Sequence, residues 1–172
     1  IMADMLCSLV RLPDIQPLLE KLKADNIFIR RPNPWDLNAL REFIIEHFSE
    51  GWAQEAAIAF SAKPITCFIA TKDDKIIGFG GYECTRRNYF GPTGVAEDMR
   101  GRGIGTTLLL ACLYGLQDLG YTYAVIGGAG PVEFYKKAVD AIDIPFDEGK
   151  GIYGLKEEPR FMFSQQRPSK ED

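Results

Sequence analysis

A glycine-rich segment near the middle of the chain has the composition of a phosphate-binding turn. Between a strand expected to end at Val95 and a helix expected to begin at Gly103, the sequence reads Arg100-Gly101-Arg102-Gly103-Ile104-Gly105-Thr106. A helix start leaves backbone N–H groups without intrahelical partners, and glycines let a ligand approach them closely. The helix dipole, the two arginines and the Thr106 hydroxyl all favour an anion, so we expect this turn to hold a pyrophosphate. A tight connection without a ligand is the alternative.

Two other phosphate-binding motifs fail on spacing. A P-loop needs Lys-Ser/Thr after its second glycine, whereas Thr106-Thr107 follow Gly105. A dinucleotide fingerprint that begins at Gly103 meets Leu108 in place of its third glycine, and no acidic residue ends the next expected strand. The pattern that remains is Arg-x-x-Gly-x-Gly, which begins at Arg100.

A second motif, Phe134-Tyr135-Lys136-Lys137, lies on a short expected helix after the next strand. With Arg-x-x-Gly-x-Gly in register before it, the chain resembles the GCN5-related N-acetyltransferase (GNAT) family, and the likeness in element order covers roughly residues 27–155. The sequence departs from the family pattern at Gly128, where an asparagine is frequent, and at Pro131, where an alanine is frequent. These departures concern contacts to the cofactor's adenosine and pantetheine parts.

The resemblance implies an α/β (α+β) fold with a mixed, mainly antiparallel sheet whose central strands splay apart, flanked by helices. It also implies acetyl-CoA as co-substrate, without a metal. Val95 would present its backbone to the pantetheine arm, and residues 100–106 would hold the pyrophosphate. Tyr135 would be the general acid that protonates the departing thiolate. The alternative for Tyr135 is an aromatic packing residue on an amphipathic helix.

The general base has no clear candidate. An acceptor amine must lose a proton before or during attack, and Glu83 on an expected strand is our choice, with a solvent-facing strand residue as the alternative. His47, the only histidine, lies near the end of an expected helix, where a cation simply favours the dipole. Cys84 is expected to be a packed thiol, because direct transfer needs no acetylated enzyme.

The acceptor pocket is expected between the connection Phe48 to Trp52 and the loop Asp147 to Gly151. Glu50, Asp147 and Glu148 can attract a cationic amine there, although these charges can equally serve only to solvate loops. The expected activity is acetyl transfer to a primary amine of a small molecule or peptide by direct attack. The competing hypothesis is a non-catalytic acyl-CoA-binding or sensing module.

The elements that must position these residues follow from apolar periodicity. Gly91-Pro92 lies inside one expected strand and predicts a bulge, because proline removes a ladder donor. The expected strands are residues 27–31, 65–71, 75–84, 89–95 and 121–126, with two more within 142–155. The turn-forming residues Lys72-Asp73-Asp74 predict that 65–71 and 75–84 form an antiparallel hairpin. The expected helices are one through Leu37, Leu40, Ile44 and Phe48, and residues 52–62, 103–119 and 131–139.

Length and composition bound the remaining possibilities. The chain has 172 residues, 46% of them hydrophobic, and a net charge of −4, which predicts one soluble domain and gives no basic excess for nucleic acid or a membrane surface. We expect an N-terminal extension over 1–26, consisting of a short apolar segment and a helix packed on the domain, then the acetyltransferase domain over 27–157 and a polar tail over 158–172. No leader or membrane span is expected, which favours a cytoplasmic location; dimerisation stays open. The four cysteines show no CxxC spacing, so neither zinc nor a disulfide framework is expected.

Overall fold

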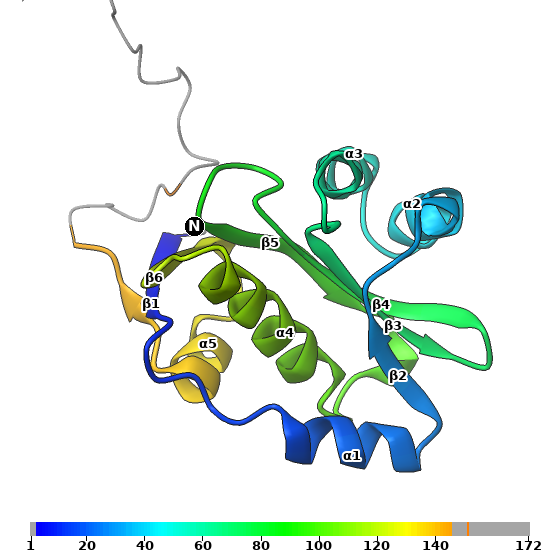
Figure 1. The fold of residues 1–172 in the computed structure, drawn as a ribbon, viewed down its shortest axis with the longest axis horizontal. Helices are drawn as coiled ribbons and strands as arrows, with labels where there is room; N and C mark the ends of the chain where they lie inside the picture. Colours follow the sequence, from blue (N-terminus) through cyan, green and yellow to red (C-terminus); the bar gives the residue numbers. More distant parts are fainter. Residues whose placement is uncertain (1–2, 146–150, 152–172) are drawn as a thin grey trace, which may run out of the picture.

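The computed structural model describes residues 3–145 and residue 151, with helices on both faces of a sheet (Figure 1). The strands of these residues are β1 Ala3–Ser8, β2 Ile27–Arg30, β3 Cys67–Lys72, β4 Lys75–Tyr82, β5 Tyr89–Val95, β6 Tyr123–Ala129 and β7 Ile142–Asp143. They form one sheet in the order β2-β3-β4-β5-β6-β1-β7. The pair β5 and β6 is parallel and the other pairs are antiparallel. The mixed, mainly antiparallel α+β fold expected from the sequence is confirmed.

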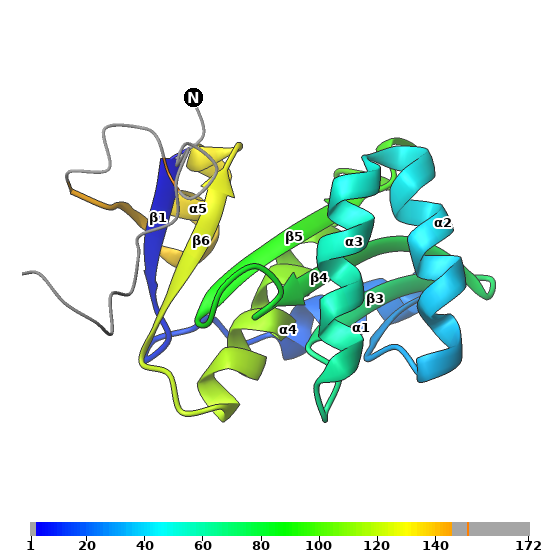
Figure 2. The same cartoon turned by 90° about the horizontal axis from the view of Figure 1, so that it is seen from above.

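Helices cover both faces of the sheet. They are α1 Gln16–Ala24, α2 Leu37–His47, α3 Glu50–Ile58, α4 Ile104–Asp118 and α5 Val132–Val139. Figure 2 shows α2 and α3 on one side of β3, β4 and β5, with α4 on the other. Because side chains alternate along a strand, Ile69 of β3 belongs to the apolar core formed with α2 and α3, while its neighbour Ala70 belongs to the core that contains Leu108 of α4. Both faces are therefore apolar and covered.

The β3–β4 hairpin follows its sequence signal closely. Lys72 pairs with Lys75, so the turn consists of Asp73 and Asp74, whose φ angles are +49° and +60°. Aspartate tolerates this left-handed region better than most residues, and two such residues match the twist of the flanking strands. The strands begin and end within two residues of their expected bounds.

The N-terminal segment contributes a strand to the sheet. The short apolar stretch expected at the start of residues 1–26 is β1, which lies between β6 and β7. Met5 and Cys7 of this strand, and Leu9 just after it, are fully buried. This partner also lengthens β6, which runs to Ala129 instead of ending at Ile126 as expected. The pairs Met5–Ile126 and Ala3–Ala129 lie on either side of Gly127-Gly128, a stretch that has little strand propensity of its own.

The long helix α4 lies against β3, β4 and β5 and is apolar nearly all round. Gly103 precedes it and Gly120 follows it, both with φ of +93°, a conformation that costs glycine little. The helix agrees with the expected range 103–119 to within one residue at each end. Within residues 3–145, no helix combines the length and the apolar character needed to cross a membrane.

Several expectations fall outside the described residues. Of the two strands expected within 142–155, β7 is described, and the remainder of that region is not, apart from Gly151. Asp147 and Glu148 of the expected acidic loop, and the tail 158–172, likewise lie outside.

Candidate active site

The parallel strands β5 and β6 separate at one end. They pair at Tyr89 with Val125 and at Phe90 with Ile126, after which no further pair is described. At the same point β5 bulges against β4, because three steps along β5, from Phe90 to Thr93, face two steps along β4. The bulge predicted at Gly91-Pro92 is therefore present, and it leaves the edge of β5 open toward a ligand.

The glycine-rich turn, residues 100–106, lies beside β5 at the N-terminal end of the helix α4. Gly101 and Gly103 have φ angles of +79° and +93°, and Gly103 is the residue that caps α4. As in any α-helix, the first backbone N–H groups of α4 have no intrahelical hydrogen-bond partner. The first turn of α4 carries no acidic side chain that would repel an anion. Arg100 is held at the same end by a hydrogen bond from its Nε to the Val95 carbonyl at 3.2 Å. The arrangement suits a pyrophosphate.

Two adjoining cavities connect this turn to Tyr135. The cavity at the start of α4 has a volume of about 730 Å³ and is bordered by Arg100 and Thr106, among others. The second, of about 370 Å³, lies between β5 and β6 and is bordered by Tyr135. Both are bordered by Val95 and Phe134, so they form one continuous groove. Every residue that the sequence assigned to cofactor binding except Arg102, which is exposed, borders this groove.

Tyr135 lies in an apolar setting at the inner end of the groove. Its ring meets the edges of Phe90 and Phe134, with centroids 6.2 Å and 5.1 Å away. Burial in this environment raises the pKa of the Tyr135 phenol to about 12, because the phenolate would be poorly solvated. The hydroxyl therefore stays protonated at neutral pH and can donate a hydrogen bond.

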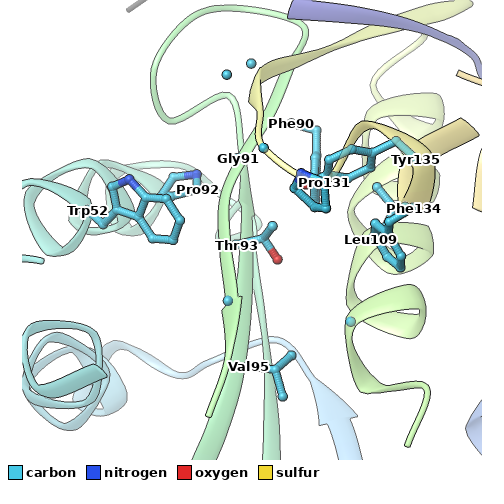
Figure 3. A pocket seen from close by; sticks show the side chains of 15 residues that line it. Trp52, Phe90, Gly91, Pro92, Thr93, Val95, Leu109, Pro131, Phe134 and Tyr135 are labelled. Carbon is cyan, nitrogen blue, oxygen red and sulfur yellow. The ribbon is translucent and has the colours of Figure 1, made fainter. Parts of the chain in front are cut away.

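The cavity between β5 and β6 has walls from both faces of the sheet. Figure 3 shows Trp52 of α3 on one side of β5, and Leu109 and Phe134 on the other. Trp52 stacks on Phe48 with centroids 5.5 Å apart, and the Phe48 ring lies so close to Gly94 that a side chain there would overlap it. Phe48 and Trp52 thus border the groove where the sequence placed the acceptor pocket.

Among the acidic residues that the sequence proposed for the acceptor site, Glu50 and Glu83 lie within the described part of the chain, and neither borders a cavity. Glu50 is exposed and borders neither cavity. Glu83 is expected on a strand, but it lies outside one, because β4 ends at Tyr82. It has a φ of +56° in the β4–β5 loop, and its carboxylate accepts hydrogen bonds from the Asn88 N–H at 2.9 Å and the Tyr121 hydroxyl at 2.5 Å. Its assignment as base stays a prediction, and this placement keeps it off the cavity walls.

His47 and the cysteines also stand apart from the groove. His47 is exposed at the end of α2, with its ring against Phe43 at a centroid distance of 4.7 Å. All four thiols are buried, and burial raises the pKa of Cys84 to about 12, so it is a poor nucleophile. Among residues 3–145 and 151, no group of three or more His, Cys, Asp or Glu side chains is placed to hold a metal ion.

Sequence reasoning missed one polar residue beside the groove. Asp4 on β1 is 5% exposed, and its carboxylate accepts hydrogen bonds from the Gly128 N–H at 2.8 Å and the Tyr89 hydroxyl at 3.2 Å. Gly128 borders the cavity between β5 and β6. The one available signal was an aspartate inside an apolar strand segment, a placement that calls for polar partners.

Comparisons with known proteins agree with this geometry. A family model described as acetyltransferase (GNAT) domain matches residues 63–138. A glucosamine N-acetyltransferase region in a fungal multi-domain β-N-acetylglucosaminidase superposes with a TM-score of 0.64 at 18% identity, over 80% of this chain and 19% of that one. A GCN5-related N-acetyltransferase from Sphaerobacter thermophilus gives 0.57 at 20% identity, over 83% and 48%. A GNAT acetyltransferase from Brucella melitensis, in complex with acetyl-CoA, gives 0.51 at 20% identity, over 70% and 88%.

These structural likenesses establish the fold. The chain spans about a fifth of the fungal protein and about half of the Sphaerobacter protein. A search of curated proteins found no match. Residues 63–138, which carry the groove's β5, α4 and nearly all of α5, thus match the model of the GNAT acetyltransferase domain, and the chain shares the fold of GNAT structures over most of its length.

Proposed function

We propose that the protein transfers an acetyl group from acetyl-CoA to a primary amine by direct attack. In this reaction the amine nitrogen bonds to the thioester carbon, the carbon–sulfur bond breaks, the nitrogen loses a proton and the sulfur leaves as thiol. The observation that carries the proposal is the continuous groove that runs from the start of α4 to Tyr135. It offers a polar end for a diphosphate and an apolar end for a thioester.

The residues of the groove fit the parts of acetyl-CoA. The α4 N–H groups, with Arg100 and Thr106, would bind the diphosphate, and the open edge of β5 at Val95 would pair with the pantetheine amides. The bound molecule supplies an acetyl group already activated as a thioester. Tyr135 would donate a hydrogen bond where negative charge develops on sulfur, since its phenol remains protonated.

Direct transfer is supported by the two-sided cavity. Because Trp52 borders it from the α3 face and Tyr135 from the α5 side, an acceptor and a donor can enter from opposite faces and meet in the gap. The buried thiols, with pKa values raised above their ordinary range, offer no competing route through an acetyl-cysteine.

A thiol-release assay tests the proposal. Purified protein with acetyl-CoA would be offered a panel of amines that includes polyamines, amino acids, aminoglycosides, peptide amines and glucosamine, the last because the fungal region similar in fold acts on it. The expected result is amine-dependent thiol release, with mass spectrometry identifying an N-acetyl product. A signal that depends on water alone, or no binding of acetyl-CoA by calorimetry, would contradict it.

One observation favours a second candidate, an acyl-CoA-binding or sensing module. Among the described residues, no Asp, Glu or His side chain borders either cavity. A module without a general base would bind acetyl-CoA in calorimetry and acetylate no amine in the same panel. The two measurements together therefore separate the candidates.

A further inference from the structure

At the end of the gap where β5 and β6 still pair, the other edge of β6 pairs irregularly with β1. Along β6, three steps from Ile126 to Ala129 face only two steps along β1, from Met5 to Ala3. Gly127 and Gly128 therefore stand opposite Asp4, in a bulge, and Gly128 has a φ of +56°. This is also the place where β6 has already lost β5 as a partner.

The Asp4 carboxylate replaces part of the missing strand pairing. One oxygen accepts the Gly128 N–H at 2.8 Å, and the other accepts the Tyr89 hydroxyl at 3.2 Å. Tyr89 belongs to the first of the two residue pairs that still join β5 to β6. One buried side chain on β1 thus contacts both strands at the point where they separate.

The residues fixed in this way border the reaction space. Gly127 and Gly128 border the smaller cavity, and the chain then runs through Gly130 and Pro131, which also border it, into the helix that carries Tyr135. A buried backbone N–H without a partner is costly, so loss of the carboxylate would leave Gly128 free to seek another conformation. A shift there moves the cavity wall and the segment leading to Tyr135.

We propose that Asp4 is a positioning residue, which clamps β5 and β6 at the closed end of the cavity and so keeps the thioester end of the groove and Tyr135 in register. The kinetic part of this inference rests on the proposed acetyl transfer. The diphosphate end of the groove lies at the start of α4 and at Val95, the end of β5 that is remote from Tyr89 and the contacts of Asp4. The clamp should therefore govern turnover more than the affinity for CoA.

The test compares Asp4→Asn with Asp4→Ala. The asparagine amide oxygen can still accept the Gly128 N–H, and its NH₂ can donate to the Tyr89 oxygen, whereas alanine can do neither. We expect Asp4→Ala to lower kcat about 10- to 100-fold, the effect of a small misplacement of reacting groups, with the Kd for CoA changed less than about 3-fold. Asp4→Asn should stay within about 3-fold of the parent protein. Asp25→Ala, which removes an exposed carboxylate after α1, is the matched control and should leave kcat unchanged.

Hydrogen exchange at the Gly128 amide gives a readout that does not depend on activity. Exchange should be slow in the parent protein and in Asp4→Asn, and faster in Asp4→Ala. If the protein acetylates no amine, the proposed function fails while this measurement still decides the clamp. Unchanged exchange in Asp4→Ala, or an Asp4→Asn variant as inactive as Asp4→Ala, would overturn the proposal; the second result would mean that charge is what matters.

A further variant covers the case in which Asp4→Ala does not fold. Tyr89→Phe removes only the hydroxyl that reaches the carboxylate from β5 and leaves the Gly128 contact in place. We expect kcat to fall about 3- to 10-fold, less than in Asp4→Ala because one of the two contacts of the clamp remains and the reacting groups are misplaced less, with CoA affinity retained. A kcat equal to that of the parent protein would remove the link to β5 and overturn the clamp.

Discussion

Replacement of Tyr135 by phenylalanine tests the chemistry assigned to the inner end of the groove. The variant removes one hydroxyl and keeps the ring that packs against Phe90 and Phe134. Burial holds the phenol pKa at about 12, whereas an ordinary thiol has a pKa of about 8.5. Complete proton transfer from this phenol to a thiolate would then cost about 5 kcal/mol, so Tyr135 should act mainly as a hydrogen-bond donor to the charge that develops on sulfur.

The size of the effect follows from that role. A hydrogen bond to a charged group is worth about 1.5–3 kcal/mol, which corresponds to a fall in kcat of about 10- to 150-fold. The affinity for CoA should change little, because the charge on sulfur exists only in the transition state. Steady-state thiol release gives kcat, and calorimetry gives the Kd for CoA. Tyr123→Phe, which changes an exposed tyrosine on β6, is the matched control.

The pH dependence sharpens the test. A phenol with a pKa of about 12 stays protonated from pH 7 to 10, so the kcat profiles of the parent and of Tyr135→Phe should have the same shape over that range and differ only in height. Equal kcat values in the two proteins would refute the donor role. A basic limb near pH 9 that is present in the parent and absent in the variant would refute the assigned pKa.

Three other outcomes can be measured on the same preparations. Gly103→Ala and Gly120→Ala both place a side chain at a φ of +93°, so each should lower the free energy of unfolding by about 1–2 kcal/mol in urea. Of these two glycines, Gly103 alone borders the groove, so Gly103→Ala should in addition weaken CoA binding about tenfold. Arg100→Gln should weaken CoA binding about 2- to 5-fold at low ionic strength and less at high salt, since an exposed cation is screened; a salt-independent difference would argue against this charge. Burial raises the pKa of Cys7 to about 11 and that of Cys84 to about 12, so these thiols lose their protons at lower pH in the unfolded chain than in the folded protein. The stability that they contribute should be complete below about pH 9 and fall as the pH rises toward 12. Replacing both thiols by alanine should make this fall smaller in thermal melts.

The local elements and the groove's polar end were readable from residue types. Asp73-Asp74 between two β-rich runs specified a hairpin, and Gly91-Pro92 specified a bulge, because these residues restrict or free the backbone whatever surrounds them. The same holds for Gly103, whose left-handed conformation and place before an apolar helix mark the turn that we propose binds the diphosphate. Tyr135 was found through its motif, and the structure adds the apolar surroundings that keep it protonated.

Other features depended on which strands meet. The sequence pattern predicts a strand at Glu83, but the chain turns at that residue. Its carboxylate accepts a hydrogen bond from Tyr121, which is far away in the sequence. The end of β6 could not be located from its glycines, since the hydrogen bonds that extend it come from β1. Pairing across such sequence separations leaves little trace in local periodicity.

The sequence by itself determined that a glycine turn with open helix-start N–H groups would precede an apolar helix and that a tyrosine would follow the next strand, because backbone freedom and helix-start N–H groups are local properties. Only the tertiary structure decided what stands around them. It inserted β1 beside β6, brought Asp4 against Gly128 and Tyr89, and left Glu50 and Glu83 away from the cavity walls. The reason is physical: a buried carboxylate must find donors, and which donors it finds is settled by the packing of strands that are distant in the chain.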